Sequence, residues 1–283
     1  MNAADQKISE DPALGKATQI LWTGGWDSTF RLLQLLIIHN MKVQPWYIMD
    51  PDRFSLSYEL RAMQYIRNTF SNTFPAFKDH LLPTQYIELN SIPLNEDILN
   101  SINRIREKNP LGQQYNWLSS FAFFYTLRDL EISLEKGGDG IFNFLRQKFT
   151  YINEDGVTFF KVDPKYEGSD EYNVFQYFRF PLMEISKLDM KGISKEHGFY
   201  HILNTSWFCH HPRSNGTPCG VCIPCAGVVH AGMRHRLPAS SQWRYVFRDY
   251  MNRDNFKKKY PGWHAIGRKV KHRIKGNKKK VPE

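Results

Sequence analysis

Several features are missing from this sequence. It has no run of about 18 apolar residues, the length of a membrane-spanning helix, since its most apolar stretch covers only residues 32–38. The first residues, MNAADQKISEDPALGK, lack the charged-then-apolar order of a secretory signal. Internal repeats are also missing. With 283 residues and 41% apolar composition, the chain is long enough for a hydrophobic core. We therefore expect a globular, cytoplasmic protein.

Acidic residues become rare toward the end of the chain. Residues 226–283 hold 16 Lys and Arg against 3 Asp and Glu, whereas residues 1–225 hold 22 against 25. The basic tail, which we place at residues 237–283, contains FKKKY and GRKVKHRIKGNKKK. Such a tail is typical of segments that bind RNA or DNA by counterion release. The alternative is a solvated C-terminus that only aids solubility.

Cysteine is scarce, and all of it lies in one span with the pattern C-x9-C-G-V-C-I-P-C. A cytosolic protein with no other cysteine is not expected to form structural disulfides. Two-residue gaps let thiolates converge on one tetrahedral ion, which predicts a closed, structural Zn²⁺ site within residues 201–236. The predicted ligands are Cys209, Cys219, Cys222 and Cys225. His210 and His211 are alternatives for the first ligand, and an iron–sulfur cluster is an alternative for the metal.

Short apolar runs alternate with amphipathic stretches from residue 19 to residue 200. We expect strands at residues 19–22, 43–49, 85–89 and 140–145, and helices at 28–38, 56–70, 116–134 and from Ser186 to about 197. Strands and helices in alternation predict the α/β class, with a doubly wound parallel sheet. Residues 149–178 interrupt the pattern with polar and aromatic residues, and we expect an irregular hairpin or lid there.

The first predicted strand leads into LWTGGWDSTF, residues 21–30. This stretch is neither a G-x4-G-K-[ST] loop nor a G-x-G-x-x-G loop. A strand that ends in two glycines before a helix leaves backbone N–H groups facing open space, and the helix dipole favours an anion there. Gly24 and Gly25 would let a phosphate approach the backbone, and Asp27 would recruit Mg²⁺. The hydroxyl donors would be Thr23, Ser28 and Thr29. The alternative is a tight structural turn.

The same stretch resembles the S-G-G-x-D-S loop of the PP-loop ATP pyrophosphatases, with Thr23 in place of the first serine. Farther along, FPLMEISKLDMKGISKEHGF and TSWFCHHPRSNGTPCGVCIPC are similar to the end of the 7-cyano-7-deazaguanine synthases, the QueC family. The resemblance extends over residues 19–233. It implies an adenine nucleotide α-hydrolase-like PP-loop domain at residues 19–200, with residues 1–18 as an N-terminal extension, and a homodimer.

The resemblance also implies a reaction, in which ATP activates a 7-deazaguanine carboxylate such as 7-carboxy-7-deazaguanine. The carboxylate attacks the α-phosphate, pyrophosphate leaves, and ammonia or another amine donor converts the adenylate to an amide. A second activation then dehydrates the amide to a nitrile. Lys187 would offset charge on the departing group, and the catalytic set would be Asp27, Ser28 and Lys187. ATP and Mg²⁺ would be held by Thr23, Gly24, Gly25, Asp27, Ser28 and Thr29, with Tyr47, Ile48 and Met49 beside the adenosine.

Two family segments have no full counterpart in this chain. The family's P-G-R-N segment corresponds to residues 112–116, where Asn116 is kept but the arginine is missing, and the Y-P-D-C-R-P-E segment has no equivalent in residues 149–178. We therefore expect an altered substrate. QueC-like proteins with such departures occur in antiphage defence, where the activated base passes to a protein or nucleic acid. The alternatives are a PP-loop enzyme that modifies tRNA and a non-catalytic module that binds nucleic acid or protein.

Overall fold

The computed structural model describes residues 17–136 and 141–252, in two compact units, Met1–Phe208 and Cys209–Glu283. Most of the predicted N-terminal extension, at residues 1–16, lies outside the described residues, as does the basic tail from residue 253. Among the described helices, none combines the length and the apolar composition that crossing a bilayer requires.

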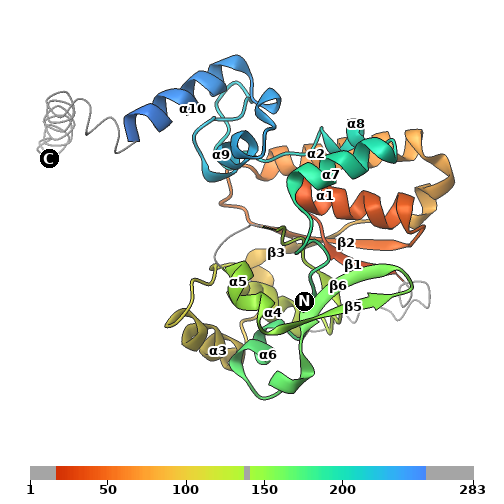
Figure 1. Cartoon of the computed structure of the whole chain (residues 1–283), viewed down its shortest axis with the longest axis vertical. Coiled ribbons are helices and arrows are strands. Elements are labelled where there is room, and N and C mark those ends of the chain that lie inside the picture. The colour runs from red at the N-terminus through yellow and green to blue at the C-terminus, as the bar shows by residue number, and fades with distance from the viewer. Residues whose placement is uncertain (1–16, 137–140, 253–283) are drawn as a thin grey trace, which may run out of the picture. The chain divides into compact units, whose positions relative to one another are not determined.

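A five-stranded parallel sheet forms the centre of the first unit (Figure 1). Its strands are β1 (Thr18–Leu21), β2 (Val43–Met49), β3 (Gln85–Glu88), β4 (Leu130–Glu131) and β7 (Phe178–Arg179), in the order β3-β2-β1-β4-β7. The chain builds outward from β1 to β3 and then returns to the other side of β1, so the strand order reverses between β1 and β4. The predicted α/β class is confirmed, and the topology is compatible with a doubly wound fold.

Helices cover both faces of this sheet (Figure 1). One layer contains α1 (Trp26–Leu33), α2 (Leu56–Thr73), α7 (Lys187–Glu196) and α8 (Tyr200–Leu203). The other contains α3 (Glu96–Arg106), α4 (Tyr115–Phe124), α5 (Ile141–Arg146) and α6 (Asp170–Phe175). Because its two faces are both covered, strand β2 is an almost continuous buried run, which explains why it shows no alternation in the sequence.

Helix α7 begins at the predicted residue. The Ser186 hydroxyl accepts a hydrogen bond from the backbone N–H of Asp189, and the Asp189 carboxylate accepts one from the backbone N–H of Ser186. This reciprocal capping box satisfies two backbone donors that the first helical turn leaves open. It fixes the helix start, and with it the position of Lys187 in the first turn.

The helix predicted at residues 116–134 is confirmed at its start, where α4 covers Tyr115–Phe124, but its extension to residue 134 is wrong. Helix α4 ends at Phe124, and Thr126 and Asp129 then adopt positive φ angles of 54° and 60°, which no helix continues through. The chain next forms strand β4, which pairs with β1 on one side and β7 on the other. Asp129 holds this corner by ion pairs with Lys161 and Arg179.

The predicted strand at residues 140–145 is also wrong, because Ile141–Arg146 forms helix α5, while residue 140 lies outside the described residues. A short apolar run carries no periodicity that separates a strand from a buried helix. The region 149–178 is more regular than predicted. Its hairpin is formed by β5 (Phe149–Glu154) and β6 (Val157–Val162), and α6 follows. The hairpin turn, Asp155-Gly156, has positive φ at both residues, as tight two-residue turns require.

The described part of the second unit consists of a cysteine-bearing loop followed by helices. Helix α9 (Ile223–His230) begins directly after Cys222, a short 3-10 turn covers Arg234–Arg236, and α10 (Ala239–Asn252) follows. The Tyr245 hydroxyl lies 3.0 Å from His230 Nε2 and joins α10 to α9. Buried Val228, Met233 and Leu237 supply apolar side chains to this small unit.

Candidate functional site

The turn between β1 and α1 requires glycine. Gly24 has a φ of +66°, and a Cβ atom there would lie 2.8 Å from Met63 Cγ and 3.2 Å from the Glu59 carbonyl oxygen. The Gly24 carbonyl also accepts a hydrogen bond from the backbone N–H of Trp207, at 2.8 Å. Gly25 is the N-cap of α1 and has an extended conformation, with no side-chain cap. The turn is therefore rigid, and the first N–H groups of α1 have no partner within the helix.

The three predicted hydroxyl donors differ in their surroundings. Thr29 is fully buried and its hydroxyl accepts a hydrogen bond from Trp22 Nε1, at 3.1 Å, so it joins the strand to the helix. Ser28 is nearly buried, and its hydroxyl accepts a hydrogen bond from the backbone N–H of Thr23, at 3.3 Å. The Thr23 and Ser28 hydroxyls also lie 3.3 Å apart. Thr23 is only partly buried, so of the two hydroxyl residues it is the more exposed to solvent, and it lies at the turn.

Lys187 and Asp27, which the resemblance assigned to one site, lie together in the structure. Lys187 Nζ is 3.1 Å and 3.2 Å from the two Asp27 carboxylate oxygens, although 160 residues separate them in the sequence. Glu135 is a second ion-pair partner of Lys187. Asp27 follows β1, Glu135 follows β4 and Lys187 follows β7, so the three converge at the carboxyl ends of neighbouring parallel strands. The reversal of strand order between β1 and β4 is the usual ligand-binding position in such sheets.

The electrostatics of this cluster keep Lys187 charged. Burial acts to lower the pKa of Lys187, but the charges of Asp27 and Glu135 and the hydrogen bonds to them raise it, and its pKa lies above the ordinary lysine value. A lysine with a raised pKa is a poor general base at neutral pH. It is suited to hold negative charge in place.

The predicted adenosine-side residues lie at the end of β2, next to the turn. Leu21 of β1 is in register with Trp46, so Tyr47, Ile48 and Met49 extend past the end of β1. The Tyr47 side chain is fully buried and its hydroxyl donates to Glu59 Oε2 at 2.7 Å. Burial, followed by the Glu59 charge, raises the pKa of Tyr47 far above its usual value. The Tyr47 side chain is therefore used in packing, which leaves the backbone of this residue for binding a ligand.

A buried ion pair that the sequence did not reveal holds α1 against the central strand. Arg31 Nε lies 2.7 Å from Glu131 Oε2, and a second guanidinium nitrogen donates to Glu131 Oε1 at 2.7 Å. The two side chains are only 2% and 1% exposed. A bidentate pair fixes both position and orientation. It therefore sets α1, and the turn before it, relative to β4 and Glu135.

The four cysteines of the second unit form one cluster. Their Sγ atoms all lie within 4.8 Å of one another, and the pairs Cys219–Cys225 and Cys209–Cys222 are 3.9 Å apart. Four thiolates at about 2.3 Å from one tetrahedral Zn²⁺ ion would lie roughly 3.8 Å apart. The cluster can therefore hold a metal ion such as zinc. Neither His210 nor His211 belongs to it among the described residues, and the close sulfur spacing favours a single ion over an iron–sulfur cluster.

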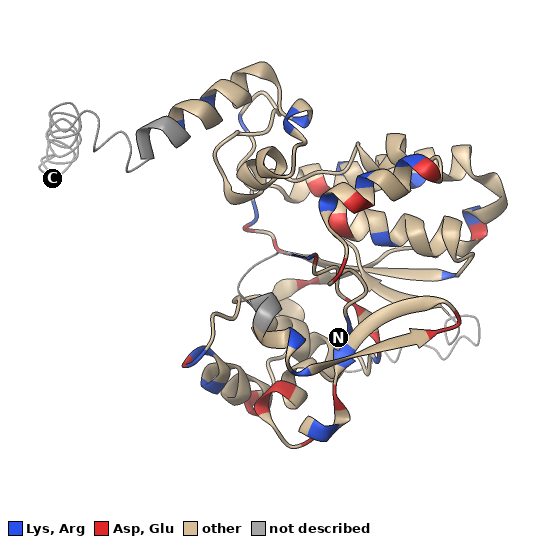
Figure 2. Cartoon of the chain, viewed as in Figure 1, with Lys and Arg blue, Asp and Glu red and all other residues tan. Residues whose placement is uncertain are grey.

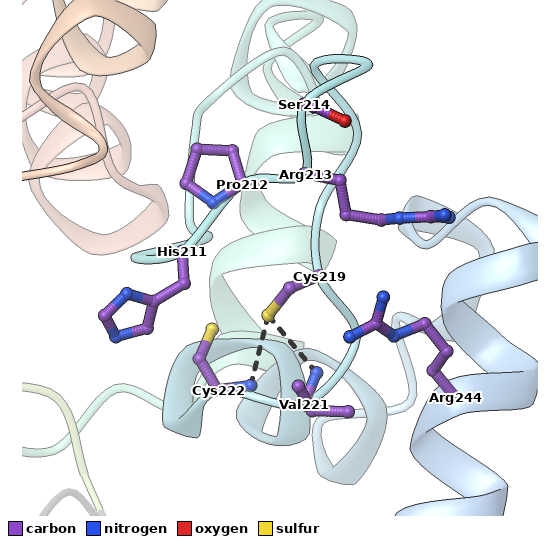
Figure 3. Close-up of a pocket in the computed structure, with 8 residues that line it drawn as sticks. All are labelled: His211, Pro212, Arg213, Ser214, Cys219, Val221, Cys222 and Arg244. Carbon is purple, nitrogen blue, oxygen red and sulfur yellow. Dashed lines mark hydrogen bonds between the residues drawn. The ribbon is translucent and has the colours of Figure 1, made fainter. Parts of the chain in front are cut away.

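Backbone N–H groups point at these sulfur atoms (Figure 3). The backbone nitrogens of Val221 and Cys222 both donate to Cys219 Sγ at 3.3 Å, and Cys219 N donates to Cys209 Sγ at 3.1 Å. Hydrogen bonds of this kind stabilise thiolates and orient metal ligands. The tight turn behind them depends on Gly220, which has a φ of +79°. The surroundings of the cluster thus suit the charged form of cysteine.

Thiols packed this closely cannot ionise independently. Hydrogen bonds from Cys209 and Cys225 hold the pKa of Cys222 far below its usual range. Hydrogen bonds with Cys209 and then with Cys222, together with burial, raise the pKa of Cys225 far above its usual range. Because cysteine binds a metal as the thiolate, metal uptake by this cluster releases protons.

Sequence reasoning missed Glu135 and Glu131, because both belong to or follow a strand that it assigned to a helix. Placing Glu135 at the carboxyl edge of the sheet would have required recognising β4, a strand of two buried residues that is too short to show a pattern. Comparison with known proteins gives no independent indication of the family, since no family model matches the sequence and no curated protein matches it.

Proposed function

We propose that the first unit is an ATP-dependent ligase that adenylates a carboxylate of the 7-deazaguanine type and releases pyrophosphate. The proposal rests on one observation: Lys187 forms ion pairs with Asp27 and Glu135 beside a glycine turn at a helix N-terminus. An isolated structural ion pair needs only one acid. A nucleotide phosphate site needs a fixed cation, oxygen ligands and N–H groups in one place.

Each part of this cluster has a role in the proposed reaction. The N–H groups of the Gly24-Gly25 turn and of the first turn of α1 would bind phosphate oxygens, assisted by the Thr23 and Ser28 hydroxyls. Asp27 and Glu135 offer carboxylate oxygens, the ligands that Mg²⁺ prefers, and the ion would neutralise phosphate charge when bound. Lys187 would stabilise the charge that develops on pyrophosphate as it leaves. The backbone of residues 47–49 would lie beside the adenosine.

In the proposed chemistry, a carboxylate oxygen of the substrate attacks the α-phosphorus of ATP. The bond between the α-phosphorus and its bridging oxygen breaks, and pyrophosphate leaves with the electron pair. An amine, either ammonia or an amino group of a macromolecule, then attacks the acyl carbon and displaces AMP. The hairpin β5–β6 and α6 occupy residues where the resemblance places substrate-pocket residues, which supports an acceptor other than that of the biosynthetic enzymes.

The test is an assay for pyrophosphate and AMP with ATP, Mg²⁺, ammonium and 7-carboxy-7-deazaguanine, together with mass spectrometry of the base. Replacing one preorganised charge-stabilising donor typically costs about 100- to 1000-fold in rate. Lys187→Met and Asp27→Asn should therefore lower pyrophosphate release by about this factor. Lys191→Met changes a lysine one turn farther along α7 that has no ion pair among the described residues, and it should leave the rate unchanged.

Two other results would replace the proposal. AMP that appears only when tRNA is added would identify a PP-loop enzyme that modifies tRNA. Absence of AMP with every substrate, combined with absence of ATP binding by calorimetry, would identify a non-catalytic module. Retention of full activity in Lys187→Met would show that the Asp27–Glu135–Lys187 cluster is a structural ion pair only.

A further inference from the structure

The second unit has no acidic side chain over most of its described length. From Cys209 to Arg248 the sequence contains five arginines and neither Asp nor Glu. Figure 2 accordingly shows blue without red along this part of the chain. A Zn²⁺ ion with four thiolates carries a net charge of about −2, so the five arginines would still leave this part positive with a metal bound. Its charge therefore favours an anionic partner.

Two of these arginines border an open pocket of about 530 Å³ beside the cysteine cluster. Figure 3 shows Arg213 reaching from the loop toward α10 and Arg244 reaching from α10 toward the loop. His211 and Ser214 also line the pocket. None of the ion pairs between described residues involves either arginine, and the Arg213 guanidinium has a 3.3 Å hydrogen bond to the Ser240 hydroxyl. Planar guanidinium groups in this position are suited to bind phosphate oxygens.

Next to this pocket, α10 exposes aromatic side chains. Trp243 is 75% exposed, Phe247 is 67% exposed and Val246 is 39% exposed. The spacing of three and four residues puts them on one face of the helix, while Ser241 and Tyr245 on the opposite face are buried. This set of exposed residues is here called the α10 aromatic face. Large apolar side chains that cluster on a protein surface usually mark a binding site for a ligand or a macromolecule.

We propose that the α10 aromatic face and the Arg213–Arg244 pocket together bind single-stranded nucleic acid. The arginines bind backbone phosphates, and Trp243 and Phe247 stack on unpaired bases. Both contacts are of the kind that single-strand binding surfaces use. A duplex keeps its bases stacked on one another and offers no base faces to these rings.

The charge of this surface favours single-stranded nucleic acid over the other candidate partner, a second copy of the chain. A symmetric dimer through α10 would bring two copies of a surface that carries five arginines between Cys209 and Arg248 together, which like-charge repulsion opposes. A polyanion has the complementary charge and brings bases for the aromatic side chains. The inference does not rest on the proposed ligase activity, because neither the pocket nor α10 includes a residue of the ATP cluster.

The experiment is fluorescence anisotropy of the full-length protein, without ATP, with a labelled 12-nucleotide deoxythymidine oligomer. An abasic oligomer with the same number of phosphates is the second probe. The two probes separate base–aromatic stacking from phosphate contacts. Basic residues that contact only phosphates bind both probes equally, whereas stacking strengthens binding of the thymidine oligomer alone. Wild-type protein should bind the thymidine oligomer more tightly than the abasic one.

The combined variant Trp243→Ala with Phe247→Ala should weaken thymidine binding about 10- to 100-fold and leave abasic binding unchanged. Trp243→Phe keeps a stacking ring and should keep most of the affinity. The combined variant Arg213→Ala with Arg244→Ala should weaken binding of both probes. It should also reduce the slope of log affinity against log salt concentration by about 1.4, the value for two phosphate contacts on a single strand. Tyr65→Ala and Arg61→Ala, exposed changes on α2, are the matched controls and should have no effect.

Three outcomes would overturn the proposal. One is equal affinity of wild-type protein for the two oligomers. Another is unchanged thymidine binding in the aromatic variant. The third is a concentration-dependent dimer, seen by sedimentation, that the aromatic variant abolishes while oligonucleotide affinity stays the same. Loss of pyrophosphate release has no bearing on any of these readouts, so failure of the proposed ligase function and failure of this inference are distinguishable.

Discussion

Replacing Gly220 with alanine should break the contact between the cysteine loop and α10. At a φ of +79°, an alanine costs about 1–2 kcal/mol through backbone strain. The new Cβ would also meet the backbone of Ser241, at 2.8 Å from its carbonyl carbon and 3.0 Å from its Cα, and closer still to its carbonyl oxygen. Backbone atoms cannot rotate away as a flexible side chain would, so the first turn of α10 must shift.

This shift has a calculable cost. It separates the Ser241 hydroxyl from the Pro218 carbonyl that it donates to, and one such hydrogen bond contributes about 1 kcal/mol. It also loosens the packing of buried Tyr245, for which partial loss of contact costs about 1–2 kcal/mol. Together with the backbone strain, we expect the second unit to lose about 4 kcal/mol, which is at the upper end of single-residue effects.

Hydrogen exchange measured by mass spectrometry gives the assay, because it reports each unit separately. A loss of about 4 kcal/mol corresponds to roughly 1000-fold faster exchange of protected amides such as that of Met233, whose N–H donates to the Val228 carbonyl. Gly198→Ala is the control, because Gly198 has a similar φ of +75° but nothing within 4 Å of its Cβ position. If Gly220→Ala accelerates exchange no more than Gly198→Ala does, the predicted collision with α10 is refuted.

Three further predictions concern other parts of the chain. Arg31→Met leaves its buried acidic partner unpaired and should lower the free energy of unfolding by about 3–5 kcal/mol in urea titrations; a change under 1 kcal/mol would contradict this. Burial acts to raise the pKa of Asp129, but hydrogen bonds from Arg179 and Lys161 outweigh it, so its pKa is lowered on folding. Its stabilisation is therefore present above the unfolded-state pKa and lost as the pH falls through the folded value, and Asp129→Asn should flatten the acid side of the stability curve. Cys222→Ser should reduce bound zinc, measured by plasma mass spectrometry, and hydrogen exchange should increase throughout residues 209–248; retained zinc at one ion per chain would contradict its role as a ligand.

The sequence predicted those parts of the protein whose residues are neighbours along the chain. The glycine turn and the four cysteines are continuous motifs, and the capping box at Ser186 and Asp189 needs only three residues. Lys187 could be matched with Asp27 only through the resemblance, since periodicity says nothing about a pair separated by 160 residues.

The remaining features depend on tertiary contacts. Strand β4 has two residues, both buried, so it carries neither length nor alternation as a signal. Because the sequence did not predict β4, it could not predict that Glu131 and Glu135 lie at the sheet. The tail prediction recognised positive charge from residue 237 onward, but only packing decides that Tyr245 faces inward while Trp243 and Phe247 face outward. Which face of α10 is buried is set by what the helix packs against.

Strand β1 and strand β4 are neighbours in the sheet, although Ile20 pairs with Glu131 across more than a hundred residues of chain. While a nascent chain is shorter than this, β1 has its β4-facing edge exposed, and unpaired edges are where strands from different molecules associate. At synthesis rates of about 5–20 residues per second, this state lasts for several seconds on the ribosome. A fragment stalled before residue 130 would therefore expose a strand edge that the complete sheet covers.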